Sequence, residues 1–128
     1  MSKACTIYSI TEQVSIDTFK HEFTTLRDSC FNDEELQELE ERPLQSKAGV
    51  YAIKKALVNL YKTLLKAEQV TEKMFIISHK KNGAPRIKKA PNIPKSLNRF
   101  SKKNIHISIS HNRDHAYGLA AIQENMYG

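Results

Sequence analysis

The sequence predicts an α+β fold in which an antiparallel sheet packs with about three helices. Three observations lead to this prediction: a β-branched segment near the start, a central run of helical spacings, and strictly alternating apolar residues in the second half. Strands and helices that are grouped along the chain, rather than regularly alternating, are typical of this class. At 128 residues the chain is predicted to form a single domain, residues 1–128, around one modest core.

The first part of the chain is predicted to hold one strand and two helices. Residues 5–10 are β-branched and aromatic, which predicts a short strand. A helix is then predicted from residue 15 to about residue 27, because apolar residues fall at helical intervals at Ile16, Phe19, Phe23 and Leu26. Asn32 followed by Glu35 is a capping-box pattern, which predicts a second, strongly acidic helix that Pro43 ends.

The longest predicted helix runs from residue 44 to residue 66. Its core stripe consists of Val50, Ile53, Leu57, Leu60 and Leu64, with Ala48, Ala52 and Ala56 beside it. The nearly opposite stripe is cationic and consists of Lys47, Tyr51, Lys54, Lys55, Lys62 and Lys66. Taken alone, such a stripe indicates a solvated helix face.

The second half is predicted to be mostly strands. Residues 74–79 predict a strand, and Asn82-Gly83 predicts a tight turn after it. A loop with Pro91 and Pro94 follows. Residues 105–110 alternate isoleucine with polar residues at a period of two, which is the clearest strand signal in the chain. A turn at residues 111–115 and an apolar strand over residues 116–122 complete a hairpin.

Composition narrows the class of protein. Forty per cent of the residues are apolar and 27 per cent are charged, which is ordinary for a globular protein. No apolar run approaches the roughly 18 residues that span a bilayer, and no signal peptide is evident. The two cysteines do not suggest a disulfide scaffold or a zinc site. We therefore expect a cytoplasmic protein with no membrane partner.

The net charge of +6 is unevenly distributed. Residues 1–46 hold four Lys/Arg and ten Asp/Glu, whereas residues 47–128 hold sixteen and four. The basic part is expected to attract a polyanion. Nucleic acid, the phosphates of a nucleotide and an acidic protein all satisfy that expectation.

Three segments together carry a resemblance to a known family. Residues 45–57 read QSKAGVYAIKKAL and are similar to a helix motif with Ala-Gly, an aromatic residue and Lys-Glu-Ala. Asn82-Gly83-Ala84-Pro85 is similar to a Gly-Lys-Pro turn, and Ser108-Ile109-Ser110-His111 is similar to a Ser-x-Ser-His hairpin. Residues 9–12, SITE, align with an Asp-Ile-Thr-Glu segment. In this order, the segments resemble the holo-acyl-carrier-protein synthase class of 4′-phosphopantetheinyl transferases.

The resemblance implies a definite reaction. The hydroxyl of a carrier-protein serine attacks the β-phosphate of coenzyme A, phosphopantetheine is transferred, and 3′,5′-ADP leaves. The implied substrate and partner are coenzyme A and an acyl or peptidyl carrier protein, as in fatty acid biosynthesis. Members of this class form homotrimers with a site at each junction, so a homotrimer is expected here.

The sequence departs from the family at the metal ligands. A Mg²⁺ that bridges the diphosphate is expected of the family, held by an aspartate of the first strand and a glutamate of the long helix. Ser9 and Lys55 stand at these two positions, and Asn59 replaces the second lysine of the helix motif. An ammonium in place of a carboxylate repels a divalent cation. We therefore predict that no residue of the chain serves as a metal ligand.

The remaining residues give the predicted site. Lys54 and Lys55 are the candidate catalytic residues. Lys55 is expected to pair directly with the diphosphate, with Lys54 beside it, because lysine is a good point-charge binder of phosphate. The resemblance assigns coenzyme A binding to Lys54, Asn82, Gly83, Pro85, Ser108, Ser110 and His111. Two other functions remain open. One is a non-catalytic homologue that binds coenzyme A or a partner in a carrier-protein pathway. The other, the least supported, is a basic nucleic-acid-binding domain, because no aromatic residues interleave with the lysines.

Overall fold

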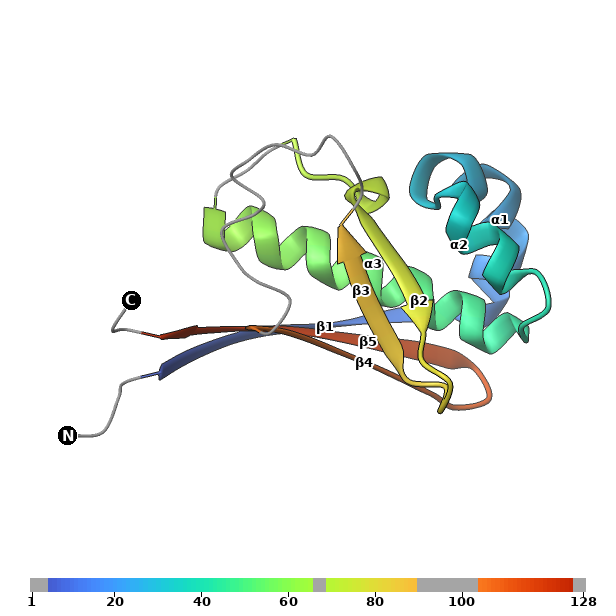
Figure 1. Ribbon diagram of the computed structural model, residues 1–128. Helices are drawn as coiled ribbons and strands as arrows, with labels where there is room; N and C mark the ends of the chain where they lie inside the picture. Colours follow the sequence, from blue (N-terminus) through green and yellow to red (C-terminus); the bar gives the residue numbers. More distant parts are fainter. Residues whose placement is uncertain (1–4, 66–68, 90–103, 126–128) are drawn as a thin grey trace.

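The computed structural model describes residues 5–65, 69–89 and 104–125 (Figure 1). The predicted α+β class, with three helices and antiparallel strands, is confirmed. In chain order the elements are β1 (Cys5–Ser15), α1 (Ile16–Cys30), α2 (Asp33–Leu39), α3 (Leu44–Leu65), a 3₁₀ turn (Glu72–Met74), β2 (Phe75–His79), β3 (Pro85–Lys89), β4 (Ile105–His111) and β5 (His115–Asn125). Among the described residues, no helix is both long enough and apolar enough to cross a membrane.

The larger sheet has three antiparallel strands in the order β1-β5-β4. β1 pairs with β5 along its whole length, from Cys5 opposite Asn125 to Ser15 opposite His115. β4 and β5 form the predicted hairpin, which closes at His111 opposite Ala116. β1 and β4 are therefore the two edges of this sheet, separated by β5.

Helix α3 lies across one face of the larger sheet, and the core lies between them (Figure 1). The predicted stripe of α3 is buried at Val50, Ile53, Leu57 and Leu60, and Leu64 is partly buried against the same core. Gly118 of β5 permits this packing, because a Cβ there would overlap the backbone of Ala52 and Ile53. Helix and strand thus touch through their main chains.

β2 and β3 form a separate antiparallel hairpin that contacts α3 and β4 (Figure 1). Its tight turn contains Gly83 at φ 89°, a conformation that glycine adopts without strain. The Gly83 N–H donates a hydrogen bond to the Lys80 carbonyl (2.9 Å), and the Lys80 N–H donates one to the Ala84 carbonyl (2.8 Å). The turn predicted at Asn82-Gly83 is therefore present, whereas β3 was not predicted.

The starts of α1 and α2 are both capped, and the cap of α2 was predicted from its capping-box pattern. Ser15 caps α1 by accepting a hydrogen bond from the Thr18 N–H (3.3 Å). The Glu35 carboxylate accepts from the Asn32 N–H (2.9 Å), as a capping box requires. The strands β1 and β5 are longer than predicted, and α1 continues to Cys30. The predicted loop with Pro91 and Pro94, and the predicted end of α3 at Lys66, lie outside the described residues.

Candidate active site

A polar cluster lies where the middle of α3 faces the edge strand β1. The Asn59 side-chain amide donates a hydrogen bond to the Glu12 carboxylate across this junction. Lys55 lies one helical turn before Asn59, with its ammonium 5.6 Å from the centre of the Tyr51 ring. One carboxylate, one amide and one ammonium therefore lie along the same border of α3.

Glu12, rather than Ser9, is the acidic residue of β1 that faces α3. Successive side chains of a strand point to opposite faces. Ile10 packs against the core and Val14 is buried, so Glu12 between them shares their face. Ser9 is three positions from Glu12, which places its exposed side chain on the other face. The Ser9 side chain therefore does not face α3, and its alignment with the family's aspartate stays a prediction.

Sequence reasoning missed Glu12, although a signal was present. The family alignment of residues 9–12 pointed to Ser9. The alternation of Ile10, Glu12 and Val14 instead places Glu12 on the side of the strand that faces the core. A carboxylate between two core residues needs a polar partner, which Asn59 provides.

Lys54 is buried and does not line an open groove. Its side chain is fully inaccessible and its ammonium forms an ion pair with Glu35, also fully inaccessible. The ammonium also donates to the Phe75 carbonyl (2.7 Å). Burial lowers the pKa of Lys54, and the Glu35 carboxylate opposes this shift. The expectation that Lys54 belongs to an exposed cationic stripe was wrong, because its partners already occupy its ammonium.

The Lys54–Glu35 pair also joins three elements. The second Glu35 oxygen accepts from the Ile77 N–H of β2 (2.8 Å), and the first accepts from Asn32 at the start of α2. The network therefore connects α2, α3 and β2, and fixes the hairpin relative to the long helix. Lys54 is a structural residue in this chain.

The remaining predicted residues lie around β4 and the β2–β3 turn. Ser108, Ser110 and His111 are exposed on β4, and Asn82 and Gly83 are exposed in the turn. The Asn82 side-chain carbonyl accepts from the Ala84 N–H (3.0 Å), which shapes the turn. Pro85 is half-buried at the start of β3.

A single chain does not bring all the predicted residues together. Glu12 and its neighbours border one edge of the sheet, whereas Ser108 and Ser110 lie on β4 at the other edge. The two serines also point away from α3, because the isoleucines that alternate with them pack toward the core. The predicted site residues Lys55, Ser108 and Ser110 are therefore not brought together within one chain.

The cluster does not supply the pair of carboxylates that the family's Mg²⁺ implies. Within residues 5–65, 69–89 and 104–125, no group of three or more His, Cys, Asp or Glu side chains has a metal-binding arrangement. Glu12 is a carboxylate, but its helix-side neighbours are an amide and an ammonium. The predicted lack of a metal ligand stays a prediction.

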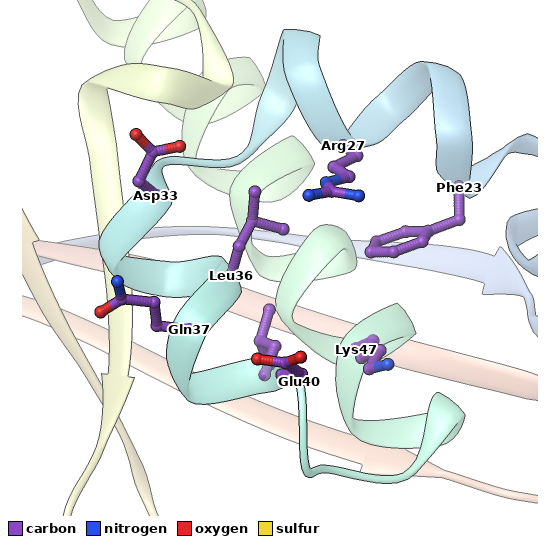
Figure 2. A pocket seen from close by; sticks show the side chains of 8 residues that line it. Phe23, Arg27, Asp33, Leu36, Gln37, Glu40 and Lys47 are labelled. Carbon is purple, nitrogen blue, oxygen red and sulfur yellow. The ribbon is translucent and has the colours of Figure 1, made fainter.

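A different hollow lies between the three helices and has a volume of about 390 Å³. Figure 2 shows Phe23 and Arg27 of α1 beside Leu36 of α2, with Lys47 of α3 across from them. Its rim carries acids and bases together, at Asp33, Glu40, Arg27 and Lys47. None of the predicted site residues lines this hollow, so it is separate from the candidate site.

Several solved structures have a fold similar to that of this chain. The ACPS–CoA complex of Chronobacterium ammoniagenes is 16% identical with a TM-score of 0.77, covering 91% of this chain and 96% of that one. Holo-[acyl-carrier-protein] synthase (AcpS) of Neisseria meningitidis is 21% identical with a TM-score of 0.73, covering 91% and 97%. Acyl carrier protein synthase (AcpS) of Mycobacterium tuberculosis is 21% identical with a TM-score of 0.71, covering 91% and 96%.

The predicted holo-acyl-carrier-protein synthase fold is therefore confirmed over most of the chain. Neither the models of known protein families nor the curated protein sequences contain a match. At identities of 21% or less, the likeness establishes the fold. A fold alone does not determine a reaction, which depends on the residues of the site.

Proposed function

We propose that this protein transfers 4′-phosphopantetheine from coenzyme A to a serine of an acyl or peptidyl carrier protein. The observation that carries the proposal is the Glu12–Asn59 contact with Lys55 one turn away, in a fold shared with holo-acyl-carrier-protein synthases. This cluster provides one group that accepts a proton and one that binds a phosphate.

Each residue of the cluster has a role in the proposed reaction. The Lys55 ammonium binds the diphosphate of coenzyme A and stabilises the charge that develops on it. The Glu12 carboxylate takes the proton of the carrier serine as its oxygen attacks the β-phosphorus. A bond forms between the serine oxygen and the phosphorus, the bond to the bridging oxygen breaks, and 3′,5′-ADP leaves. Asn59 orients Glu12 through its amide.

The complete site is proposed to lie between two copies of the chain. Glu12, Lys55 and Asn59 come from one copy, and Ser108, Ser110, His111 and the Asn82–Pro85 turn come from its neighbour. Glu12 on β1 and the β4 residues Ser108, Ser110 and His111 lie at opposite edges of the larger sheet, which supports a shared site. The sheet face away from α3 also exposes Ile7 (66%) and Leu119 (38%), which suits contact with another copy. A cyclic homotrimer in the cytoplasm is our proposal for the assembly.

The test is mass spectrometry of apo carrier proteins after incubation with coenzyme A. A panel of acyl and peptidyl carrier proteins is used, with Mg²⁺ or with a chelator, and a gain of one phosphopantetheine group is expected. Lys55→Met should abolish the gain, whereas Lys62→Met, an exposed lysine of the same helix, should not. No gain with any carrier, while coenzyme A still binds, would favour the non-catalytic homologue. The non-catalytic alternative is supported by the identity of residue 55, because this chain has Lys55 where the family has a carboxylate.

A further inference from the structure

Four aromatic side chains form a cluster between α1 and α3. The Phe19 ring lies 5.4 Å from the Phe23 ring and 6.5 Å from the Phe31 ring, measured between their centres. The Tyr51 ring of α3 lies 5.7 Å from that of Phe19 and 6.2 Å from that of Phe31. Phe19 and Phe31 are almost fully buried, at 1% and 2% exposure. Because an aromatic side chain has only two rotatable bonds, this packing fixes the orientation of the Tyr51 ring.

Three lysines of α3 hold their ammonium groups over rings of this cluster. The distances to the ring centres are 5.7 Å for Lys47 over Phe23, 5.3 Å for Lys54 over Phe31 and 5.6 Å for Lys55 over Tyr51. All three lie within the reach of about 6 Å of a cation–π interaction. Lys54 is paired with Glu35, and Lys47 borders the hollow between the helices (Figure 2). Of the three lysines, Lys55 is the one in the candidate site.

The Lys55 ammonium can bind a phosphate only if its charge stays available and its position is fixed. Lysine carries its charge on a flexible four-carbon stem, so an unsupported ammonium samples many positions. Within residues 5–65, 69–89 and 104–125, Lys55 forms no ion pair. A carboxylate partner would compete with a phosphate for the ammonium. An aromatic ring attracts the cation without neutralising it, so the Tyr51 ring is suited to hold Lys55.

The spacing along α3 places this contact next to the rest of the candidate site. Tyr51, Lys55 and Asn59 are four residues apart, which puts them on one border of the helix. Long side chains of a helix lean toward its N-terminus, so Lys55 extends over the turn that carries Tyr51. One turn later, Asn59 donates to the Glu12 carboxylate. The family's helix motif has Lys-Glu-Ala at residues 54–56, so an ammonium over this ring is a feature of this chain.

The Tyr51 hydroxyl carries no charge at neutral pH, because burial raises the pKa of Tyr51 to about 12. The attraction on Lys55 therefore comes from the face of the ring and not from a phenolate. A phenylalanine ring has the same kind of face.

We propose that Tyr51 is a positioning residue, whose ring holds the Lys55 ammonium in place for the diphosphate of coenzyme A. The inference rests on the proposed function, in which Lys55 binds that diphosphate. A purely structural Tyr51, which only packs against Phe19 and Phe31, is the alternative that the experiment has to separate.

The test is calorimetric titration of the full chain with coenzyme A, compared between variants. Tyr51→Leu should weaken binding by about threefold to tenfold, because the ring under Lys55 is lost. Tyr51→Phe keeps the ring and should bind within about twofold of the unaltered chain. Phe23→Leu is the matched control, because it removes the ring under Lys47, outside the candidate site, and should leave the affinity unchanged. Circular dichroism verifies the fold of each variant.

A double-mutant cycle separates positioning from packing. Lys55→Met removes the ammonium, so Tyr51→Leu should have no further effect on coenzyme A binding in that background. A second measurement needs no variant of Tyr51. In assigned NMR spectra of the unaltered chain, the ε-methylene protons of Lys55 should lie upfield of those of the exposed Lys62, because the Tyr51 ring current acts on them.

Each outcome decides between the inferences. Equal weakening by Tyr51→Leu with and without Lys55, or an unchanged affinity of Tyr51→Leu, overturns the positioning role. Tyr51→Phe binding as weakly as Tyr51→Leu, or equal NMR shifts of Lys55 and Lys62, overturns it too. If phosphopantetheine is still transferred in these cases, the proposed function stands. Coupling between Tyr51 and Lys55 without transfer to any carrier protein supports the positioning role and removes the proposed reaction, whereas no coenzyme A binding by the unaltered chain overturns both.

Discussion

Replacing Lys54 by methionine tests whether the buried ion pair holds α2, α3 and β2 together. The substitution keeps a long apolar side chain in the helix and removes only the ammonium. Glu35 then remains fully buried, and its remaining donors are the backbone N–H and side-chain amide of Asn32 and the backbone N–H of Ile77. The Phe75 carbonyl loses its bond to Lys54 as well.

The expected cost is large for a domain of this size. Removing one partner of a buried ion pair typically destabilises by about 3–5 kcal/mol, because the other charge is left uncompensated. With an m-value of about 2 kcal/mol/M in urea, this corresponds to a fall of about 2 M in the unfolding midpoint. Urea titration followed by circular dichroism measures the midpoint directly.

Lys62→Met is the matched control for this experiment. Lys62 is exposed on the same helix, so its replacement should change the unfolding free energy by less than about 0.5 kcal/mol. If Lys54→Met lowers the unfolding free energy by less than about 1 kcal/mol, the ion pair does not hold these elements together. The assignment of Lys54 as a structural residue would then be withdrawn.

The remaining predictions address the site, the metal, the pH dependence and the packing. Glu12→Gln should lower kcat by about 10²–10⁴-fold with little change in the KM for coenzyme A, and a steady-state assay showing unchanged kcat would remove its role as a base. Lys55→Glu should create calorimetrically detectable Mg²⁺ binding in the presence of coenzyme A, whereas tight Mg²⁺ binding by the unaltered chain would contradict our account of the cluster. Burial raises the pKa of Tyr61 to about 12, above the value of about 10 in an unfolded chain. The stabilisation that protonated Tyr61 gives the folded state is therefore complete below a pH of about 10. It is lost as the pH rises from about 10 to about 12. Unfolding titrations across this range should show the loss, and Tyr61→Phe should reduce it; an identical loss in both would point to another group. Gly118→Ala should destabilise by about 1–3 kcal/mol or more, because its Cβ overlaps the backbone at Ile53, and an unchanged melting temperature would contradict the close approach.

The sequence predicted the fold well where a regular period covered a whole element. β4 showed alternation through Ile105, Ile107 and Ile109, and α3 showed its helical stripe, so both were located nearly to the residue. β3 was missed because its five residues begin with proline and include three cations, which is not a typical strand composition. Its strand conformation depends on pairing with β2, a tertiary contact.

The candidate site was harder to predict because its residues are distant in the sequence. Lys54 looked like one more cation of a surface stripe, and nothing local showed that Glu35, 19 residues earlier, would be its buried partner. Glu12 and Asn59 are 47 residues apart, so their contact likewise depends on how α3 lies on the sheet. The strand period contained the signal for the face of Glu12, which the sequence analysis did not use, and only the fold shows that Asn59 is its partner.

The main-chain contact at Gly118 has a consequence for how this protein can change. The position of α3 is set by backbone atoms on its sheet side, where no side chain separates Ala52 and Ile53 from β5. Lys55 and Asn59 lie outside that contact, along the border with β1. Residues there can exchange a carboxylate for an ammonium, or an ammonium for an amide, without moving the helix that carries them. A substitution at Lys55 can therefore change the charge along the border with β1 while the backbone contact that positions α3 is kept.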